Sequence, residues 1–233
     1  MEKVADGLLW YVAFLFSTTL HEAAHAFAAY RLGDSTAYEG GQVTLDPIPH
    51  MRREPMGTIV VPIISFLLGG WMIGWASAPY DPNWAYNNPK ASSKMSAAGP
   101  AANLLLAILA ALAIRVGMWM GVFVPPETID YTHVIDSAQN GALYTLASFI
   151  NVFFSLNLLL LIFNLLPIPP LDGSGIIPMF LSEEKGRRYF DLVHSGSTSL
   201  IGLIVAWNIF DFVYDPLHLM FINLLFFPEA HYH

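Results

Sequence analysis

Cysteine is absent from the 233-residue chain, and charged residues make up only 12% of it. Without cysteine the chain has neither a disulfide framework nor a thiolate metal site, so any metal must be held by histidine, aspartate or glutamate. A soluble domain carries about 25% charged residues, whereas 55% of this chain is hydrophobic. The scarcity of charge therefore predicts an integral membrane protein that crosses the lipid bilayer several times.

Basic residues are also few. Ten lysines and arginines stand against 18 aspartates and glutamates, which gives a formal net charge of −8. A nucleic-acid-binding surface needs a basic patch, so we expect no nucleic-acid partner. The sequence contains neither internal repeats nor a low-complexity linker, and we expect residues 1–233 to form one domain.

Apolar segments follow one another along the chain. A helix needs about 20 residues to cross the hydrocarbon core of a bilayer, and the segments 8–32, 97–123, 141–166 and 195–214 are long enough. A further segment, 216–227, is too short to cross. These lengths predict an all-α polytopic membrane protein with four membrane-crossing helices and a short C-terminal apolar segment.

One more apolar segment, 57–79, has the length to cross but carries Pro62 and Gly69-Gly70 near its middle, and such residues break helices. Basic residues gather on the cytoplasmic side of a membrane. With Arg115 left out because it lies inside a segment, a crossing would divide the other nine basic residues six to three. A segment that enters the membrane and returns to the same side would divide them eight to one, with Lys3 alone outside. The more uneven division favours a re-entrant or broken segment and an external N-terminus.

An ionisable triple lies inside the first apolar segment. His21, Glu22 and His25 form a His-Glu-x-x-His pattern. On a helix the two histidines share a face and can bind one metal ion, while Glu22 can reach a metal-bound water. A chance match, a signal peptide and a pair of hydrogen-bonded core histidines are the alternatives. Because ionisable groups are costly at membrane depth and mark function there, the pattern favours a zinc hydrolase with one zinc ion per chain.

The end of segment 141–166 supplies a third ligand. Prolines at positions 167, 169 and 170 end or unwind the helix, and Asp172 follows directly. A carboxylate there would complete a site with the two histidines and leave a fourth position for water; capping of a turn is the alternative. Joining these residues requires segments 8–32 and 141–166 to run in parallel, which agrees with a segment 57–79 that does not cross.

Residues 42–45, Gln-Val-Thr-Leu, are compatible with a short β-strand after the first helix. Such an edge strand could pair with an unwound substrate backbone, and a plain loop is the alternative. His50 and His194 are either auxiliary groups or ordinary surface histidines.

Three ordered motifs are His-Glu-Ala-Ala-His at 21–25, Ala-Gly-Pro-Ala-Ala-Asn at 98–103, and Asn-Leu-Leu-Pro-Ile-Pro-Pro-Leu-Asp-Gly at 164–173. They resemble the motifs of the site-2 protease family of intramembrane zinc metalloproteases, in its compact branch without a PDZ domain. The resemblance implies a three-helix catalytic core with Glu22 as the base and zinc on His21, His25 and Asp172. It also implies that Asn103 and Asn164 contact substrate or transition state, although such asparagines also form interhelical hydrogen bonds.

These observations predict an intramembrane zinc endopeptidase that cuts within or near the transmembrane helices of membrane-anchored regulatory proteins. We expect it in a prokaryotic cell membrane with its active site toward the cytoplasm; the sequence leaves its oligomeric state open. The alternative is a membrane zinc-binding or zinc-carrier protein without protease activity. A carrier has no use for Glu22 and needs ionisable residues along a path, and segments 97–123 and 195–214 supply few.

Overall fold

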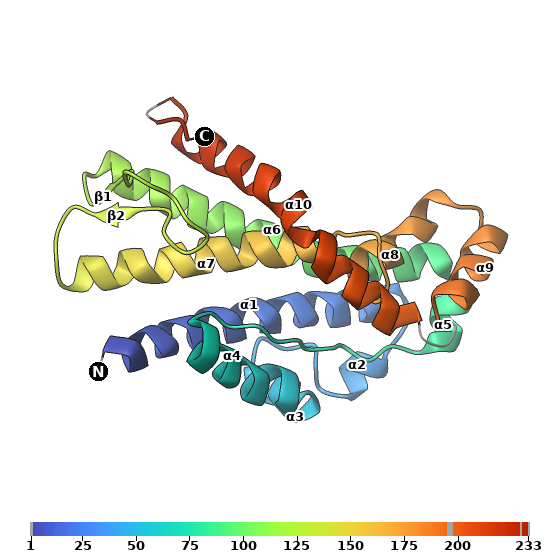
Figure 1. Ribbon diagram of the computed structural model, residues 1–233. Helices are drawn as coiled ribbons and strands as arrows, with labels where there is room; N and C mark the ends of the chain where they lie inside the picture. The colour runs from blue at the N-terminus through green and yellow to red at the C-terminus, as the bar shows by residue number, and fades with distance from the viewer. Residues whose placement is uncertain (1, 195–197, 229, 233) are drawn as a thin grey trace.

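The computed structural model describes residues 2–194, 198–228 and 230–232 (Figure 1), and most of them are helical. The long helices are α1 (Glu2–Leu32), α6 (Pro89–Trp119), α7 (Ala142–Asn164) and α10 (Thr198–Phe226). The short helices are α2 (Thr36–Glu39), α3 (Pro47–Arg53), the π-helix η1 (Met56–Val60), α4 (Val61–Gly69), α5 (Pro82–Asn87), α8 (Asp172–Ile176), the 3-10 helix η2 (Ile177–Phe180) and α9 (Glu183–Val193). The strands are β1 (Phe123–Val124) and β2 (Asp136–Ser137).

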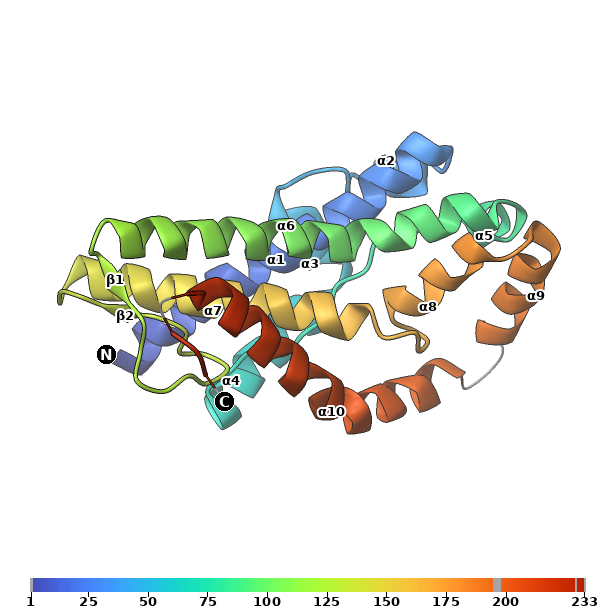
Figure 2. The same cartoon turned by 90° about the horizontal axis from the view of Figure 1, so that it is seen from above.

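Helices α1, α6 and α7 form the centre of the molecule. Figures 1 and 2 show that α1 and α7 run in the same direction and that α6 runs against them. One apolar cluster joins α6 to α7 through Ile114 and Leu158, and a second joins α1 to α7 through Phe14 and Leu156. Segments 8–32 and 141–166 therefore run in parallel, as the meeting of the three metal ligands requires.

Three helices within the described residues, α6, α7 and α10, are long and apolar enough to cross a membrane. Helix α1 has the length, at 31 residues, but His21, Glu22 and His25 lower its mean hydropathy. The mostly helical architecture with apolar, membrane-length helices is thus confirmed, and three of the four predicted crossings meet the criterion of length and apolar composition.

The C-terminal part differs from the prediction. Residues assigned to segments 195–214 and 216–227 form one continuous helix, α10, with Pro216 inside it; positions 195–197 lie outside the described residues. A proline inside a helix removes one backbone hydrogen bond and bends the helix without necessarily ending it, and Figure 2 shows α10 bent. The expectation of a separate short C-terminal segment was therefore wrong.

Segment 57–79 is broken and folds back. Its helical part, Met56–Gly69, is too short to cross a membrane, and Gly70 ends it with a left-handed φ of 78°. The chain then returns in an extended conformation, and the Trp75 amide donates to the Gly57 carbonyl at 3.1 Å. A Cβ at position 57 would lie 2.2 Å from the Trp75 carbonyl oxygen, so this close return requires glycine.

The possible short strand at 42–45 is not formed, although all four residues are described, and the alternative of a plain loop holds. The Thr44 hydroxyl accepts from the Asp46 amide at 3.0 Å, and the Thr44 carbonyl pairs with His50 Nε2 at 3.2 Å. These local bonds join the segment to the start of α3, and no described strand lies beside it to pair with. In the described residues the sheet is an antiparallel pair, β1 with β2, in the connection between α6 and α7.

Candidate metal centre

Helix α1 places the two histidines one turn apart and turns both into the bundle. His21, Glu22 and His25 are all buried, with 7%, 7% and 8% of their surfaces exposed. The two imidazole rings meet nearly edge to face, and their Nε2 atoms lie 3.0 Å apart. Two nitrogen atoms at this spacing can bind the same ion.

Asp172 reaches these nitrogens from the other end of the sequence. The chain turns sharply after α7, and a Cβ at Gly173 would lie 2.3 Å from the Leu165 carbonyl oxygen. This tight turn places Asp172 Oδ2 3.1 Å from His21 Nε2 and 3.2 Å from His25 Nε2. The three residues that the sequence singles out as metal ligands are thus brought together from α1 and α8.

The three ligand atoms fit a tetrahedral metal ion. Ligands about 2.0–2.1 Å from zinc are about 3.3 Å from one another in a tetrahedron, close to the observed 3.0–3.2 Å. Among the described residues they are also the group of three histidine and carboxylate side chains that could hold a metal. Two imidazoles with one carboxylate is a ligand set typical of catalytic zinc.

Hydrogen bonds at the far side of each imidazole prepare these nitrogens for a metal. His25 Nδ1 lies 2.8 Å from the Met95 carbonyl, and His21 Nδ1 lies 2.5 Å from Asn103 Oδ1. A carbonyl oxygen can only accept, so each Nδ1 carries the proton and donates it. Both Nε2 lone pairs therefore face the place where Asp172 Oδ2 converges with them, as in metal sites whose histidines are oriented by outer hydrogen bonds.

Gly99 of α6 forms a wall of the centre. A Cβ at this position would lie 2.3 Å from His25 Nε2 and 2.4 Å from His21 Nε2. These are almost metal–ligand distances, so a side chain here would occupy the place of the ion. We did not identify Gly99 as a site residue from the sequence, although it lies inside the motif 98–103; a glycine followed by a proline within an apolar helix was the available signal.

The two asparagines lie in different surroundings. Asn103 is completely buried, and its Nδ2 donates to Asn157 Oδ1 at 2.9 Å. It therefore lies behind His21, with both polar atoms engaged. Asn164, at the C-terminal end of α7, is partly exposed and donates to the Leu160 carbonyl at 3.0 Å.

The remaining histidines of interest lie outside this centre. His50 is buried in α3, where it bonds to Thr44, and His194 pairs with the Tyr80 hydroxyl at 3.1 Å. Neither belongs to the group that could hold a metal among the described residues. No auxiliary role for either residue follows from these contacts.

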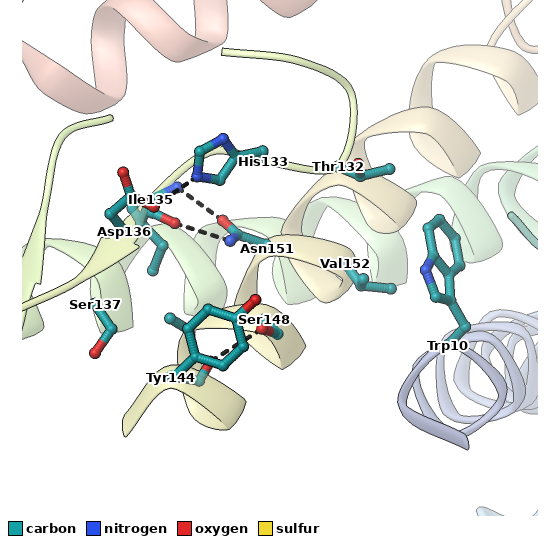
Figure 3. A pocket seen from close by; sticks show the side chains of 11 residues that line it. Trp10, Thr132, His133, Ile135, Asp136, Ser137, Tyr144, Ser148, Asn151 and Val152 are labelled. Carbon is teal, nitrogen blue, oxygen red and sulfur yellow. Dashed lines mark hydrogen bonds and ion pairs between the residues drawn. The ribbon is translucent and has the colours of Figure 1, made fainter. Parts of the chain in front are cut away.

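A separate polar cavity of about 250 Å³ lies between Trp10 of α1, the loop around β2 and the first turns of α7 (Figure 3). Asn151 accepts from the amides of Val134 and Ile135 and donates to the Ile135 carbonyl. The cavity therefore lies where the loop is fastened to α7. Trp10 precedes His21 by eleven residues, which is about 16 Å along a helix, so the cavity is remote from the metal centre.

Residues 9–207 match the family described as Peptidase family M50. Several relatives bear the name "Putative zinc metalloprotease". YwhC of Bacillus subtilis is 36% identical over 168 residues, which cover 71% of this chain and 66% of YwhC. Rip2 of Mycolicibacterium smegmatis is 30% identical over 206 residues, covering 88% and 70%, and Rip2 of Mycobacterium tuberculosis strain H37Rv is 32% identical over 193 residues, covering 83% and 64%. The chain thus spans about two thirds of the length of these relatives. No solved structure matches it significantly.

Proposed function

The chain belongs to peptidase family M50, the site-2 protease family of zinc metalloproteases, and we propose that it is an intramembrane endopeptidase that hydrolyses peptide bonds within or near transmembrane helices. The observation that carries this proposal is the convergence of His21, His25 and Asp172 inside an apolar helical bundle, with Glu22 adjacent on the same helix. The family supports the class of reaction, and the burial of the site among apolar helices long enough to cross a membrane supports its intramembrane location.

Zinc held by the three ligands would polarise the scissile carbonyl and make water a nucleophile near neutral pH. Glu22 would take a proton from the attacking water and pass it to the leaving amine. None of the hydrogen bonds between described residues uses the Glu22 carboxylate, so its oxygens are available to water. Asn164, at the C-terminal end of α7, would offer its amide to the developing oxyanion.

The substrate we propose is itself a membrane helix, from a membrane-anchored regulatory protein. Its amides are hidden in helical hydrogen bonds, so the helix must unwind locally before attack. The early turns of α6 and all of α9 lie at the same end of the molecule as α8 (Figure 1). Five basic residues occupy these helices: Lys90, Lys94, Lys185, Arg187 and Arg188. By the positive-inside rule this end faces the cytoplasm, and the bacterial relatives agree with a prokaryotic cell membrane.

A zinc carrier is the weaker alternative. A carrier needs a succession of ligand groups along its path, whereas the described residues contain a single group of three that could hold a metal. A carrier also leaves Glu22 without a role.

The test is cleavage of a purified single-span membrane substrate by the protein and by Glu22→Gln, with zinc content measured in parallel. Glutamine keeps the shape of the side chain but cannot act as a base, so we expect zinc to be retained and the cleavage rate to fall by about 10²–10⁴-fold. Glu184→Gln is the matched control, because Glu184 is exposed and, among the described residues, pairs only with Arg188 on α9. Continued cleavage by zinc-loaded Glu22→Gln would overturn the assignment.

A further inference from the structure

A line of hydrogen bonds runs from the metal centre across all three central helices. His21 Nδ1 meets Asn103 Oδ1, and Asn103 Nδ2 donates to Asn157 Oδ1 at 2.9 Å. Asn157 Nδ2 in turn donates to Ser17 Oγ at 2.9 Å and to the Phe153 carbonyl at 2.8 Å. Ser17, Asn103 and Asn157 each have 0% of their surface exposed. Burial of a polar side chain costs free energy unless the side chain is hydrogen-bonded. The hydrogen bonds along this line therefore hold the three buried side chains in defined orientations.

The far end of this line sets its direction. The Phe153 carbonyl can only accept, so the amide nitrogen of Asn157 must face it, and the Asn157 oxygen must face Asn103. That oxygen needs a donor, which fixes the nitrogen of Asn103 toward Asn157. The Asn103 oxygen is then left for His21, whose Nδ1 must bring the proton. Each amide orientation follows from its neighbour, and the last consequence is a proton-free Nε2 on His21.

His25 is held in a different way. Its Nδ1 donates to a backbone carbonyl, that of Met95, which cannot turn around. The acceptor for His21 is a side-chain amide, and rotation of that amide by 180° would present Asn103 Nδ2 to the ring. His21 Nδ1 would then have to accept, and its Nε2 would carry the proton and could not bind a metal. The orientation of Asn103 therefore decides whether His21 is a ligand.

We propose that Asn157, supported by Ser17, is a positioning residue that fixes His21 as a metal ligand through Asn103. The proposal rests on the proposed zinc site and adds a requirement that lies outside it, two side chains away from the ion. Loss of the Asn157 oxygen leaves the buried Asn103 amide nitrogen without an acceptor, so the reversed amide, with its nitrogen toward His21, becomes competitive.

The test measures zinc affinity by chelator competition on the purified full-length protein, so it does not depend on proteolysis. We expect Asn157→Leu, which has a similar volume and no polar atoms, to weaken zinc binding by about 10–100-fold, as loss of outer-shell partners does. Asn157→Asp in its neutral form keeps an acceptor for Asn103 and a donor for Phe153, so it should remain within a few-fold of the parent protein. The serine side chain of Asn157→Ser is too short to reach Asn103, so this variant should lose zinc affinity to the same extent as Asn157→Leu. It is measured in place of Asn157→Leu if Asn157→Leu does not fold.

Asn151→Leu is the matched control. Asn151 is buried in the same helix and makes three hydrogen bonds, but these go to the loop at Val134 and Ile135. Its loss should leave zinc affinity unchanged. Parent-like affinity in Asn157→Leu, or an equal loss in Asn151→Leu, would overturn the proposal. A parent protein that binds zinc but cleaves no substrate would instead refute the proposed function and leave the positioning role intact.

Discussion

Replacement of Gly99 by alanine perturbs the metal centre by a single methyl group. The new Cβ would lie 2.3 Å from His25 Nε2 and 2.4 Å from His21 Nε2. That is about 1 Å inside ordinary van der Waals contact with two ligand atoms at once. The methyl group can be accommodated only if it takes the place of the ion or pushes both imidazoles away from Asp172.

The expected loss can be estimated from this displacement. Misplacement of catalytic groups by about 1 Å costs about 10²-fold in rate, and exclusion of the ion would cost more. We therefore expect Gly99→Ala to lose at least about 10²-fold in cleavage and most of its zinc. Alanine favours helix over glycine by about 1 kcal/mol, so the bundle should remain folded. The defect should be local to the centre.

The assay is metal analysis of the purified protein together with its cleavage rate and its thermal unfolding. Gly40→Ala is the control with the same chemical change, because its nearest neighbours would be at 3.4 Å or beyond and its φ is −74°. This control should keep zinc and activity. One zinc per chain and a parent-like rate in Gly99→Ala would refute the placement of α6 against the ion.

Two further substitutions test the ligand set and the loop after α1. Asp172→Ala should lower zinc affinity by more than the about 10–100-fold that outer-shell losses cost, and unchanged zinc stoichiometry would remove Asp172 from the ligands. Burial opposes ionisation of Asp34, but hydrogen bonds from Thr36 and from the Asp81 amide outweigh it and hold the pKa of Asp34 below its usual value. A depressed folded-state pKa gives stability that is present above the unfolded pKa of about 3.9 and is lost as pH falls through the folded value. Thermal unfolding between pH 6 and about 3 should therefore depend on pH more steeply in the parent protein than in Asp34→Asn, and equal slopes would contradict this.

Local pattern and charge predicted the parts of the site that depend on short-range chemistry. The spacing of His21 and His25 on a helix is a property of five consecutive residues, and Asp172 is marked by the prolines before it. The return of segment 57–79 followed from Pro62, the Gly69-Gly70 pair and the distribution of basic residues. Each of these signals is either a short run of consecutive residues or a count of basic residues on each side of the membrane. The sequence alone therefore reveals them.

Other features depend on which distant residues meet, and the sequence did not reveal them. Whether residues 42–45 form a strand depends on a partner that the fold does not provide. Whether Pro216 ends a helix or bends it depends on packing around α10. The close approach of Gly99 to both imidazoles, and the hydrogen bond that His21 donates to Asn103, arise from the contact between α1 and α6.

The most direct measurement is the position of the cut bond. The protein would be reconstituted in phospholipid vesicles with a single-span substrate, and the products would be identified by mass spectrometry. We predict product ends inside the apolar span of the substrate with the parent protein, and no products with Glu22→Gln. Product ends confined to the aqueous flanking segments would contradict an intramembrane endopeptidase.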